Sequence, residues 1–423
     1  MISKTYCPLP FNHLYITPSN SVRVCCAFRE DIDDEGVSSL KEYKNLSDHF
    51  NHPFIKDIQQ KMLRGDKVAG CERCYYFEEH GSGESMRQGF IDTWHNEDWK
   101  KLTPPDVDNP KLEFLEMAFG NYCNLACRTC GSNLSHSWIE DEKELTRQLN
   151  DQSLVHIDIV TDGNMKRVNV ERKWQDDDLK DLRYLKVTGG EPMLHPDFYK
   201  FLEKLNPSNI YLEIYTNASW IPKKKLLDML SKFKFCSIYL SVDGTGTVQE
   251  YMRHNAKWDI TEDSTRKWLE LMKVNHNNIQ IVWTPTWSLM NGNYFIETCN
   301  WWLETINKIL GNLAKKCVVT HNNFLLYPEH YRMNLLPNQN ELKQKAKDYI
   351  NELRNSAYHG TEEVIKMTES YIEFFKSASK NEVVLKNTYF KLTNALDKIR
   401  NQSLKEMMPL TYDAMYNQKE VLK

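Results

Sequence analysis

Between residues 111 and 336 of this 423-residue chain, apolar runs that resemble β-strands alternate with helical stretches. Two of the helical stretches, 196–205 and 222–232, open on proline, which suits the first turn of a helix. This alternation predicts a parallel sheet covered by helices, because parallel strands need long crossover connections. The six expected strands are 112–119, 182–188, 210–216, 236–242, 279–286 and 317–325.

The segment after the first expected strand contains Cys123, Cys127 and Cys130, at intervals of four and then three residues. Thiolates with such spacing can bind one iron–sulfur cluster. Three protein ligands on a four-iron cluster leave one iron open to a ligand that is not protein, so these cysteines are also candidate catalytic residues. The alternative is a structural zinc knuckle, but zinc normally takes a fourth Cys or His close by, and residues 120–131 contain no His.

A second motif follows the second expected strand, at 188–192. Gly189 and Gly190 allow the backbone to approach a ligand closely, and the Glu191 carboxylate can accept hydrogen bonds from an ammonium group. Pro192 completes the motif. By itself, this segment could be only a turn between a strand and a helix.

Polar residues also follow the next three expected strands. They are Asn217, Ser241, Asp243 and Thr284. Asn217 could simply cap a helix and Asp243 could form a tight turn with the glycine after it. Because every motif falls at the carboxyl end of a strand, however, we expect them to meet at one edge of the sheet, where barrel-type active sites lie.

The three-cysteine spacing and the Gly-Gly-Glu-Pro motif together resemble the radical SAM superfamily. The resemblance implies an α/β fold, a partial (β/α)6 TIM-like barrel over residues 109–336. It also implies a [4Fe-4S] cluster on the three cysteines, with S-adenosylmethionine (SAM) chelating the open iron. Thr129 stands where that family often has an aromatic residue, a change that affects packing over the cluster more than ligation.

The same resemblance assigns roles to the polar residues. Gly189, Gly190, Glu191 and Pro192 would bind the SAM amino group. Ser241 and Arg253, twelve residues later, match an element that binds the SAM carboxylate in relatives with an auxiliary-cluster domain. Arginine suits this task because its planar guanidinium binds a carboxylate with two hydrogen bonds. The segment containing Thr284 would contact adenine, and Asn217 and Asp243 complete the expected cofactor-binding set.

The N-terminal cysteines form a second group. Cys7, Cys25, Cys71 and Cys74 resemble the ligands of the twitch domain, the short form of the SPASM auxiliary-cluster domain. Asn20 stands where that pattern usually has Gly, and the domain commonly follows the barrel rather than preceding it. The resemblance implies an auxiliary iron–sulfur cluster, and a structural zinc site remains the alternative.

The regions outside the barrel have simpler predictions. We expect residues 1–108 to be the twitch-like domain, with a hairpin over 11–17 and 22–28 and a helix over 53–64 that ends at Gly65. A Pro-rich stretch at 103–110 marks its boundary, and the polar segment 145–175 reads as an insertion. Residues 337–423 should form a helical extension, with packing stripes such as Val364, Met367 and Tyr371.

Composition narrows the classes of function. A net charge of −4 provides no basic field for nucleic acid, and no apolar run is long enough to span a bilayer. Eleven cysteines without an N-terminal signal core suit the reducing cytoplasm. Cys236, Cys299 and Cys317 lie in apolar contexts and should be buried structural thiols.

The resemblance implies reductive cleavage of SAM to a 5′-deoxyadenosyl radical that abstracts hydrogen from a substrate. Auxiliary-cluster relatives often modify peptides or proteins, so a peptide is the first expected substrate, and a nucleotide, sugar or other small molecule is the alternative. An electron donor such as flavodoxin or ferredoxin is the expected partner. A non-catalytic iron–sulfur or zinc protein is the rival class, but it would not need Glu191, Ser241 or Arg253.

Overall fold

The computed structural model describes residues 4–18, 21–28, 45–46, 48–79, 85–96, 108, 110–149, 179–377 and 381–416. The chain divides into two compact units. The first comprises Met1–Gly120 and Val168–Glu213, and the second comprises Asn121–Arg167 and Ile214–Lys423. The division falls within strand β6 (Tyr211–Thr216), so each unit contains half of that strand.

The sheet of the first unit has the strand order β2-β1-β3-β5, followed by the first half of β6. These strands are β1 (His13–Ile16), β2 (Val22–Arg23), β3 (Phe114–Ala118) and β5 (Tyr184–Thr188). The expected N-terminal hairpin is present, since β1 and β2 pair antiparallel. Strand β1 also pairs in parallel with β3, which the sequence did not predict. The N-terminal hairpin is therefore part of the same sheet as β3 and β5.

Two helices of the first unit were expected from the sequence, at 53–64 and at 196–205, and the second begins at Pro196 as predicted but ends at Leu202. Helix α3 (Pro53–Arg64) has the predicted bounds, buries Ile55, Ile58 and Met62, and ends at Gly65 in the left-handed conformation, with φ of 88°. The other helices are α1 (Leu9–Asn12), α2 (Asp48–Asn51), α4 (Glu72–Glu79), α5 (Met86–Asn96) and α7 (Pro196–Leu202), with 3-10 turns η2 (Ala69–Cys71), η6 (Pro192–Leu194) and η7 (Pro207–Asn209).

The sheet of the second unit contains the second half of β6, then β7 (Phe235–Leu240), β9 (Ile279–Trp283) and β10 (Val318–Val319). β9 pairs in parallel with both β7 and β10. A separate antiparallel ribbon joins β4 (Ala126–Cys127) to β8 (Arg253–His254). All six expected strands are present, but each is shorter than predicted, and β10 has only two residues.

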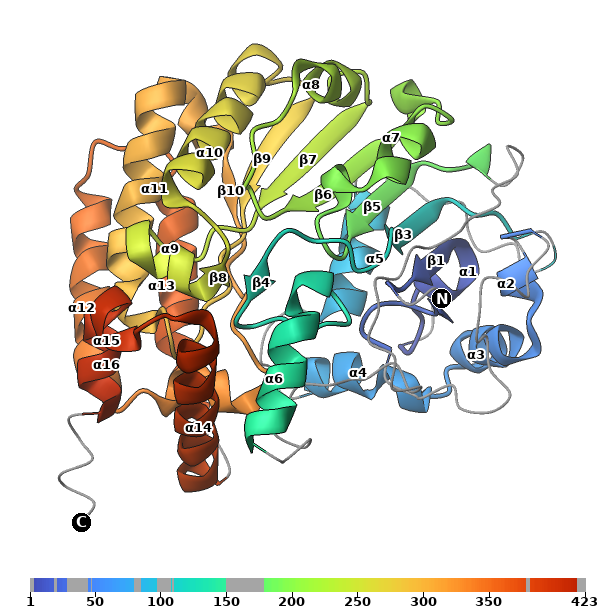
Figure 1. The fold of residues 1–423 in the computed structure, drawn as a ribbon. Coiled ribbons are helices and arrows are strands. Elements are labelled where there is room, and N and C mark those ends of the chain that lie inside the picture. The colour runs from blue at the N-terminus through green and yellow to red at the C-terminus, as the bar shows by residue number, and fades with distance from the viewer. Residues whose placement is uncertain are drawn as a thin grey trace. The chain divides into compact units, whose positions relative to one another are not determined.

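Helices make up most of the second unit (Figure 1). They are α6 (Ile139–Leu149), α8 (Lys224–Leu230), α9 (Gly246–Met252), α10 (Trp258–Val274), α11 (Phe295–Leu310), α12 (Gln339–Arg354), α13 (Thr361–Phe374), α14 (Glu382–Arg400), α15 (Leu404–Met407) and α16 (Pro409–Tyr416). The described part of this unit also has five 3-10 turns: η3 (His136–Trp138), η8 (Gly292–Tyr294), η9 (Gly311–Lys316), η10 (Glu329–Tyr331) and η11 (Met333–Leu335). Trp268, Trp283, Trp287 and Trp302 are fully buried in the core of this unit.

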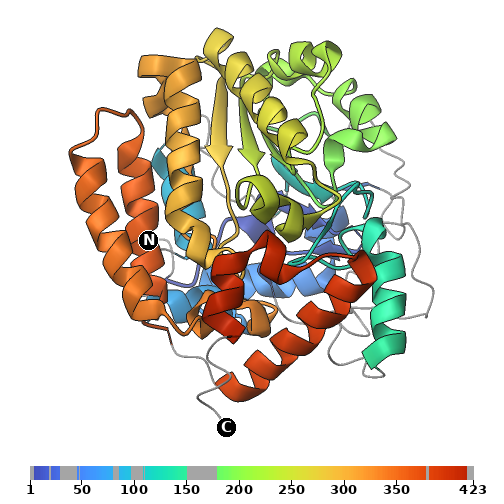
Figure 2. The same cartoon turned by 60° about the vertical axis from the view of Figure 1, so that its left-hand side comes forward.

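The C-terminal helices pack on different parts of the second unit. Figure 2 shows α12 and α13 as an orange helical hairpin, and α13 contacts β10. The stripe of Val364, Met367 and Tyr371 on α13 is buried, as predicted. Helix α14, in dark red, instead contacts α6, the helix that follows the cysteine loop. The α/β class, the parallel strands and the helical C-terminal portion are therefore confirmed.

Some sequence predictions lie outside the described residues. Asn20, most of the Pro-rich stretch 103–110 and residues 150–175 of the expected insertion belong to this group, whereas 145–149 form the end of α6. The three domains proposed from sequence, 1–108, 109–336 and 337–423, remain a prediction. In the part of the chain that the structure describes, no helix has both the length and the apolar character that a membrane span requires.

Candidate active site

The cysteine loop, residues 120–131, is anchored in its middle by the β4–β8 ribbon. Cys127 is paired with Arg253 across this ribbon, and the amide of Arg128 donates to the carbonyl of Met252 over 2.8 Å. Cys123 is buried, whereas Cys127 and Cys130 are half-buried. The ribbon thus fixes the second cysteine next to the arginine that the sequence singled out.

A short polar segment after the loop, residues 135–138, supports the loop's backbone. Its side chains bond to main-chain groups at and between the first two cysteines, and its histidine stacks on the Tyr122 ring. The bonds run from Ser135 Oγ to Leu125 O (2.5 Å), Ser137 Oγ to Cys123 O (2.7 Å), Trp138 Nε1 to Cys127 O (2.8 Å) and Cys123 N to His136 Nδ1 (3.2 Å). Sequence reasoning missed this segment, whose only signal was four hydrogen-bonding side chains directly after the motif.

Two N–H donors point at the sulfur atoms of the loop. Asn217 Nδ2 lies 3.7 Å from Cys123 Sγ, and Arg253 Nη1 lies 3.8 Å from Cys127 Sγ. Burial raises the pKa of Cys130, and the neighbouring thiols of Cys127 and Cys123 raise it further. Hydrogen bonds to sulfur are among the features that tune protein-bound iron–sulfur clusters. A set of three interacting thiols with N–H donors directed at two of them therefore fits a thiolate-ligated cluster.

Arg253 is buried and paired with Asp243. Its Nε lies 2.9 Å from Asp243 Oδ2, and the side chains of the two residues are 10% and 1% exposed. Burial lowers the pKa of Arg253, but the carboxylate of Asp243 outweighs burial and the net pKa is raised. Arg253 is therefore a permanent cation beside the cysteine loop.

Asp243 is itself fixed from several sides. Its Oδ1 accepts from the Thr286 amide (2.8 Å), its carbonyl accepts from Asn291 Nδ2 (2.8 Å), and its own amide donates to Gln249 Oε1 (2.9 Å). The sequence assigned Asp243 to the cofactor, and the structure places it as the partner of Arg253. Sequence reasoning missed Asn291 and Gln249, which lie 48 and 6 positions from Asp243, because no motif marks either of them as its partner.

The remaining candidates of the second unit lie where its strands end. The Ser241 amide donates to the Thr216 carbonyl, and the Thr284 amide donates to the Leu240 carbonyl, each over 2.9 Å. These bonds continue the links between neighbouring strands one step beyond the sheet. Asn217 donates to Asn124 Oδ1 over 2.9 Å, as well as facing Cys123. Two of the candidates, Asn217 and Arg253, thus face cysteines of the loop, and Asp243 pairs with Arg253. The other two, Ser241 and Thr284, directly follow the last residues of β7 and β9.

The Gly-Gly-Glu-Pro motif belongs to the first unit. Gly189 and Gly190 have φ of 75° and 58°, a left-handed backbone that suits glycine. A Cβ on Gly189 would lie 2.4 Å from the Cβ of Ala118, so no side chain fits there. Glu191 and Pro192 are buried. The turn that follows β5 therefore requires glycine at these two positions, because of its left-handed backbone and because Gly189 packs directly against Ala118.

Four N-terminal cysteines line one pocket of the first unit. Cys7, Cys25, Cys71 and Cys74 share this lining with Met86 and Arg87, among others. Cys26 is not among the lining residues, and its sulfur lies 3.9 Å from Met86 Sδ. Burial raises the pKa of Cys7, and the thiols of Cys71 and Cys74 raise it further. We call this the N-terminal cysteine pocket, and its four thiols are the donor set that an auxiliary cluster or a zinc ion would use.

The described cysteines do not converge on a point. Within the described ranges, no three His, Cys, Asp or Glu side chains lie close enough together to hold one metal ion. The three outlying cysteines, Cys236, Cys299 and Cys317, are buried, as expected from their apolar context. 

Three strands of the first unit bring together a buried charged cluster that the sequence did not reveal. Glu116 on β3 lies 3.2 Å from Lys186 Nζ on β5 and 3.7 Å from His13 Nε2 on β1. Burial alone would raise the pKa of Glu116, but Lys186 and then His13 lower it to about 2. This cluster is invisible in the sequence because its members are far apart in the chain.

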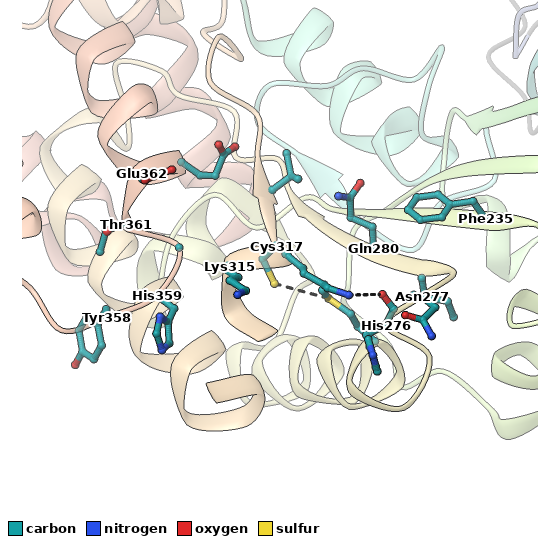
Figure 3. Close-up of a pocket in the computed structure, with 16 residues that line it drawn as sticks. Phe235, His276, Asn277, Gln280, Lys315, Cys317, Tyr358, His359, Thr361 and Glu362 are labelled. Carbon is teal, nitrogen blue, oxygen red and sulfur yellow. Dashed lines mark hydrogen bonds between the residues drawn. The ribbon is translucent and has the colours of Figure 1, made fainter. Parts of the chain in front are cut away.

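A hollow of about 880 Å³ opens elsewhere on the second unit (Figure 3). Its lining includes Phe235, Ile279 and Val318, which are the first residues of β7, β9 and β10. The motif residues instead follow the last residues of the strands. Since active sites of parallel α/β folds lie at the carboxyl ends of the strands, the hollow in Figure 3 is not the candidate active site.

One family model matches the part of the chain that contains the candidate site. Residues 117–288 match the family model described as the Radical SAM superfamily. No curated protein matches the chain. Similar solved structures include anSMEcpe with bound AdoMet, at 16% identity and a TM-score of 0.37, where the match covers 58% of this chain and 62% of that one.

Streptococcus suis SuiB bound to S-adenosylmethionine is also similar, at 16% identity and a TM-score of 0.32, with 68% of this chain and 60% of that one covered. The chain thus spans less than two thirds of the length of these structures. The matched residues contain the cysteine loop, the Gly-Gly-Glu-Pro motif, Arg253 and Thr284. Over residues 117–288, less than half of its length, the chain is therefore similar to the Radical SAM superfamily.

Proposed function

We propose that the chain is a radical SAM enzyme whose Cys123, Cys127 and Cys130 bind a [4Fe-4S] cluster. The observation that carries this proposal is the pair of N–H donors, from Asn217 and Arg253, directed at the sulfurs of Cys123 and Cys127. When bound, the cluster supplies the electron that cleaves SAM to methionine and a 5′-deoxyadenosyl radical, which removes a hydrogen atom from the substrate.

The surrounding residues would bind and orient SAM. Arg253 is a permanent cation and would bind the SAM carboxylate, with Ser241 as a second donor. Asp243 would hold the guanidinium in place, since the pair is buried and Asp243 is fixed by three further bonds. Thr284 lies at the end of β9 and would contact adenine.

In the first unit, the Gly-Gly-Glu-Pro turn would bind the SAM amino group. Glu191 would accept hydrogen bonds from the ammonium, and the backbone of Gly189 and Gly190 would lie close to the ligand. Support comes from the left-handed conformation of both glycines, which only a residue without a side chain adopts at no cost.

The N-terminal cysteine pocket would hold an auxiliary iron–sulfur cluster on Cys7, Cys25, Cys71 and Cys74, as in twitch domains. We propose a peptide or protein as the substrate, because relatives with an auxiliary cluster often modify peptides. A flavodoxin or ferredoxin would deliver the electron. A small molecule such as a nucleotide or sugar is the alternative substrate class.

The substrate proposal is tested with the anaerobically reconstituted, dithionite-reduced protein. A cell extract is divided by size into a peptide fraction and a small-molecule fraction, and each is incubated with enzyme and SAM. We expect the peptide fraction to raise the rate of 5′-deoxyadenosine formation and to contain a mass that changes in step with it. A rise confined to the small-molecule fraction would select the alternative class.

A further inference from the structure

Arg128 lies inside the cysteine loop, between the second and third cysteines, and its side chain is fully buried. Its Nη2 donates to Asp397 Oδ1 and, over 3.1 Å, to Gln402 Oε1. Its Nε donates to the carbonyl of Tyr251 over 3.1 Å, and its Cζ lies 3.7 Å from the centre of the Tyr251 ring. The loop is thus joined to a carboxylate 269 residues further along the chain.

Asp397 lies near the end of helix α14 and is held firmly there. Besides Arg128, its Oδ1 accepts from the Tyr251 hydroxyl over 2.7 Å, and its Oδ2 accepts from the Leu404 amide over 2.8 Å. The carbonyl of Asp397 accepts from the Gln402 amide over 2.9 Å, where the chain turns at Asn401 with φ of 49°. The carboxylate that faces Arg128 therefore has little freedom to move.

A second ion pair connects the same helix to the segment behind the loop. Arg400 Nε donates to Asp141 Oδ2 on α6 over 2.8 Å, and its Cζ lies 4.4 Å from the ring of Trp138. Trp138 in turn donates to the Cys127 carbonyl. Apolar packing accompanies these contacts, because Leu392 and Leu396 of α14 share a buried cluster with Ala126 and Trp138, against which Cys130 packs.

These contacts have a common consequence for the loop. A buried guanidinium with one carboxylate partner is strongly disturbed when that partner is removed, because the remaining charge lies uncompensated in the interior. Since Arg128 is covalently between Cys127 and Cys130, displacement of its side chain would displace both thiols. Mutation of residues that orient metal ligands typically changes metal affinity or activity by about 10–100-fold.

We infer that Asp397 and Arg128 are positioning residues, a pair through which helix α14 holds Cys127 and Cys130 in the geometry that binds the cluster. The inference rests on the proposed function. It assigns the C-terminal helical portion a role in the chemistry of the loop, although α14 supplies no cluster ligand.

The test compares Asp397→Asn with Glu382→Gln after anaerobic reconstitution. Both changes turn a carboxylate on α14 into an amide, but Glu382 is a half-exposed residue paired with Lys386. For each protein we measure the rate at which an iron chelator removes iron and the SAM-dependent change in the electron paramagnetic resonance (EPR) spectrum of the reduced protein. We expect Asp397→Asn to lose the iron of the loop at least about tenfold faster and to alter the spectrum, and Glu382→Gln to match wild type.

A double variant, Arg128→Met with Asp397→Leu, controls for misfolding. It removes both charges, so its apoprotein should be more thermally stable than that of Asp397→Asn, while iron loss stays about tenfold faster than in wild type. The inference is overturned if Asp397→Asn and the double variant both retain iron and the spectrum at wild-type levels. The same measurements distinguish a failure of the inference from a failure of the proposed function. If wild type and Cys127→Ala hold equal iron, the proposed function fails and the inference fails with it, whereas unchanged variants of a protein that cleaves SAM refute the inference alone.

Discussion

The cysteine loop and the N-terminal cysteine pocket present their thiols in different ways. The loop supplies Cys123, Cys127 and Cys130 from one stretch of chain, whereas the pocket collects Cys7, Cys25, Cys71 and Cys74 from separate segments. The loop's backbone is supported by its own neighbours at 135–138. The pocket exists only once helix α4, the N-terminal segment and the β1–β2 hairpin have come together.

The charged surroundings of the two groups also differ. Arg253, a buried cation, directs an N–H at Cys127. In the pocket, burial raises the pKa of Cys7 despite the nearby Arg87, whose guanidinium is already bonded to Glu78 and to the Tyr6 carbonyl. The loop thus combines three thiols with a permanent cation. The pocket offers four thiols, the number of cysteine ligands that a four-iron cluster takes.

The largest expected effect is a loss of iron and sulfide from the N-terminal cysteine pocket when Cys25 is removed. In a chain whose loop cysteines are all replaced by Ala, we expect about four iron and four sulfide per chain, held by the pocket alone. Adding Cys25→Ala should remove most of this content, because Cys25 lines the pocket, and adding Cys26→Ala should not change it. Iron and sulfide assays and the visible spectrum measure the difference.

Two results would contradict that prediction. Zinc without iron in the chain that lacks the loop cysteines would make the pocket a structural zinc site. A loss of iron with Cys26→Ala but not with Cys25→Ala would show that the neighbouring thiol is the ligand.

The next effect concerns the cation beside the loop. Arg253→Ala should weaken SAM binding by about 1.5–3 kcal/mol, the range for hydrogen bonds to charged groups, and should leave the iron content of the pocket unchanged. It should also lower the free energy of unfolding by about 3–5 kcal/mol, because Asp243 is left buried and unpaired. SAM titration and urea unfolding measure the two effects.

Arg266→Ala is the control for Arg253→Ala. Arg266 is a partly exposed arginine paired with Glu262 on α10, and its removal should cost about 0–1 kcal/mol. Wild-type SAM affinity in Arg253→Ala would mean that this arginine has no part in binding the cofactor.

The third prediction concerns how acid lowers the stability of the buried charged cluster in the first unit. Glu116 of the first unit stays ionised in the folded protein down to about pH 2, but it is protonated near pH 4.5 when unfolded. Its contribution is therefore complete above about pH 5 and is lost as the pH falls from 4.5 to 2, a loss of about 3 kcal/mol in the free energy of unfolding.

Glu116→Gln should flatten this acid dependence, measured by urea unfolding between pH 6 and pH 3. Glu341→Gln is its control, since Glu341 is exposed and paired with Lys345 on the same helix. An equal slope in wild type and Glu116→Gln would show that Glu116 does not carry the acid sensitivity.

The smallest expected effect concerns the hydrogen bonds from residues 135–138 to the backbone of the cysteine loop. Ser137→Ala removes one hydrogen bond to the Cys123 carbonyl and should lower the free energy of unfolding by about 0.5–1.5 kcal/mol. Ser208→Ala, which removes a bond between exposed side chains at residues 206 and 208, should have no measurable effect. Equal stability of the two variants would mean that the bond from Ser137 does not stabilise the loop.

The sequence predicted the features that depend on local patterns. Apolar runs alternating with helical stretches predicted the six strands, and a Pro at the start and a Gly at the end predicted helix α3. The spacing of three cysteines within one short stretch marked the cysteine loop. Arg253 was identified from its distance to Ser241 along the chain, and the structure places it beside Cys127.

The buried charge pairs that sequence reasoning missed depend on how the fold brings segments of the chain together. Asp243 pairs with Arg253, Glu116 meets Lys186 and His13 across three strands, and Arg128 binds Asp397. Each of these residues alone looks like an ordinary surface charge. Their roles appear only when the fold buries them together, because a charge in the interior requires a partner.

The most direct test of the central claim is whether the cysteine loop of the reconstituted protein cleaves SAM. Wild type and Cys127→Ala are loaded anaerobically with iron and sulfide, reduced with dithionite and incubated with SAM, and 5′-deoxyadenosine is measured. We predict slow formation of 5′-deoxyadenosine by wild type even without substrate, and none by Cys127→Ala, although that variant keeps the iron of the N-terminal cysteine pocket. A fully loaded wild-type protein that yields no 5′-deoxyadenosine, with a spectrum that Cys127→Ala leaves unchanged, would contradict the account.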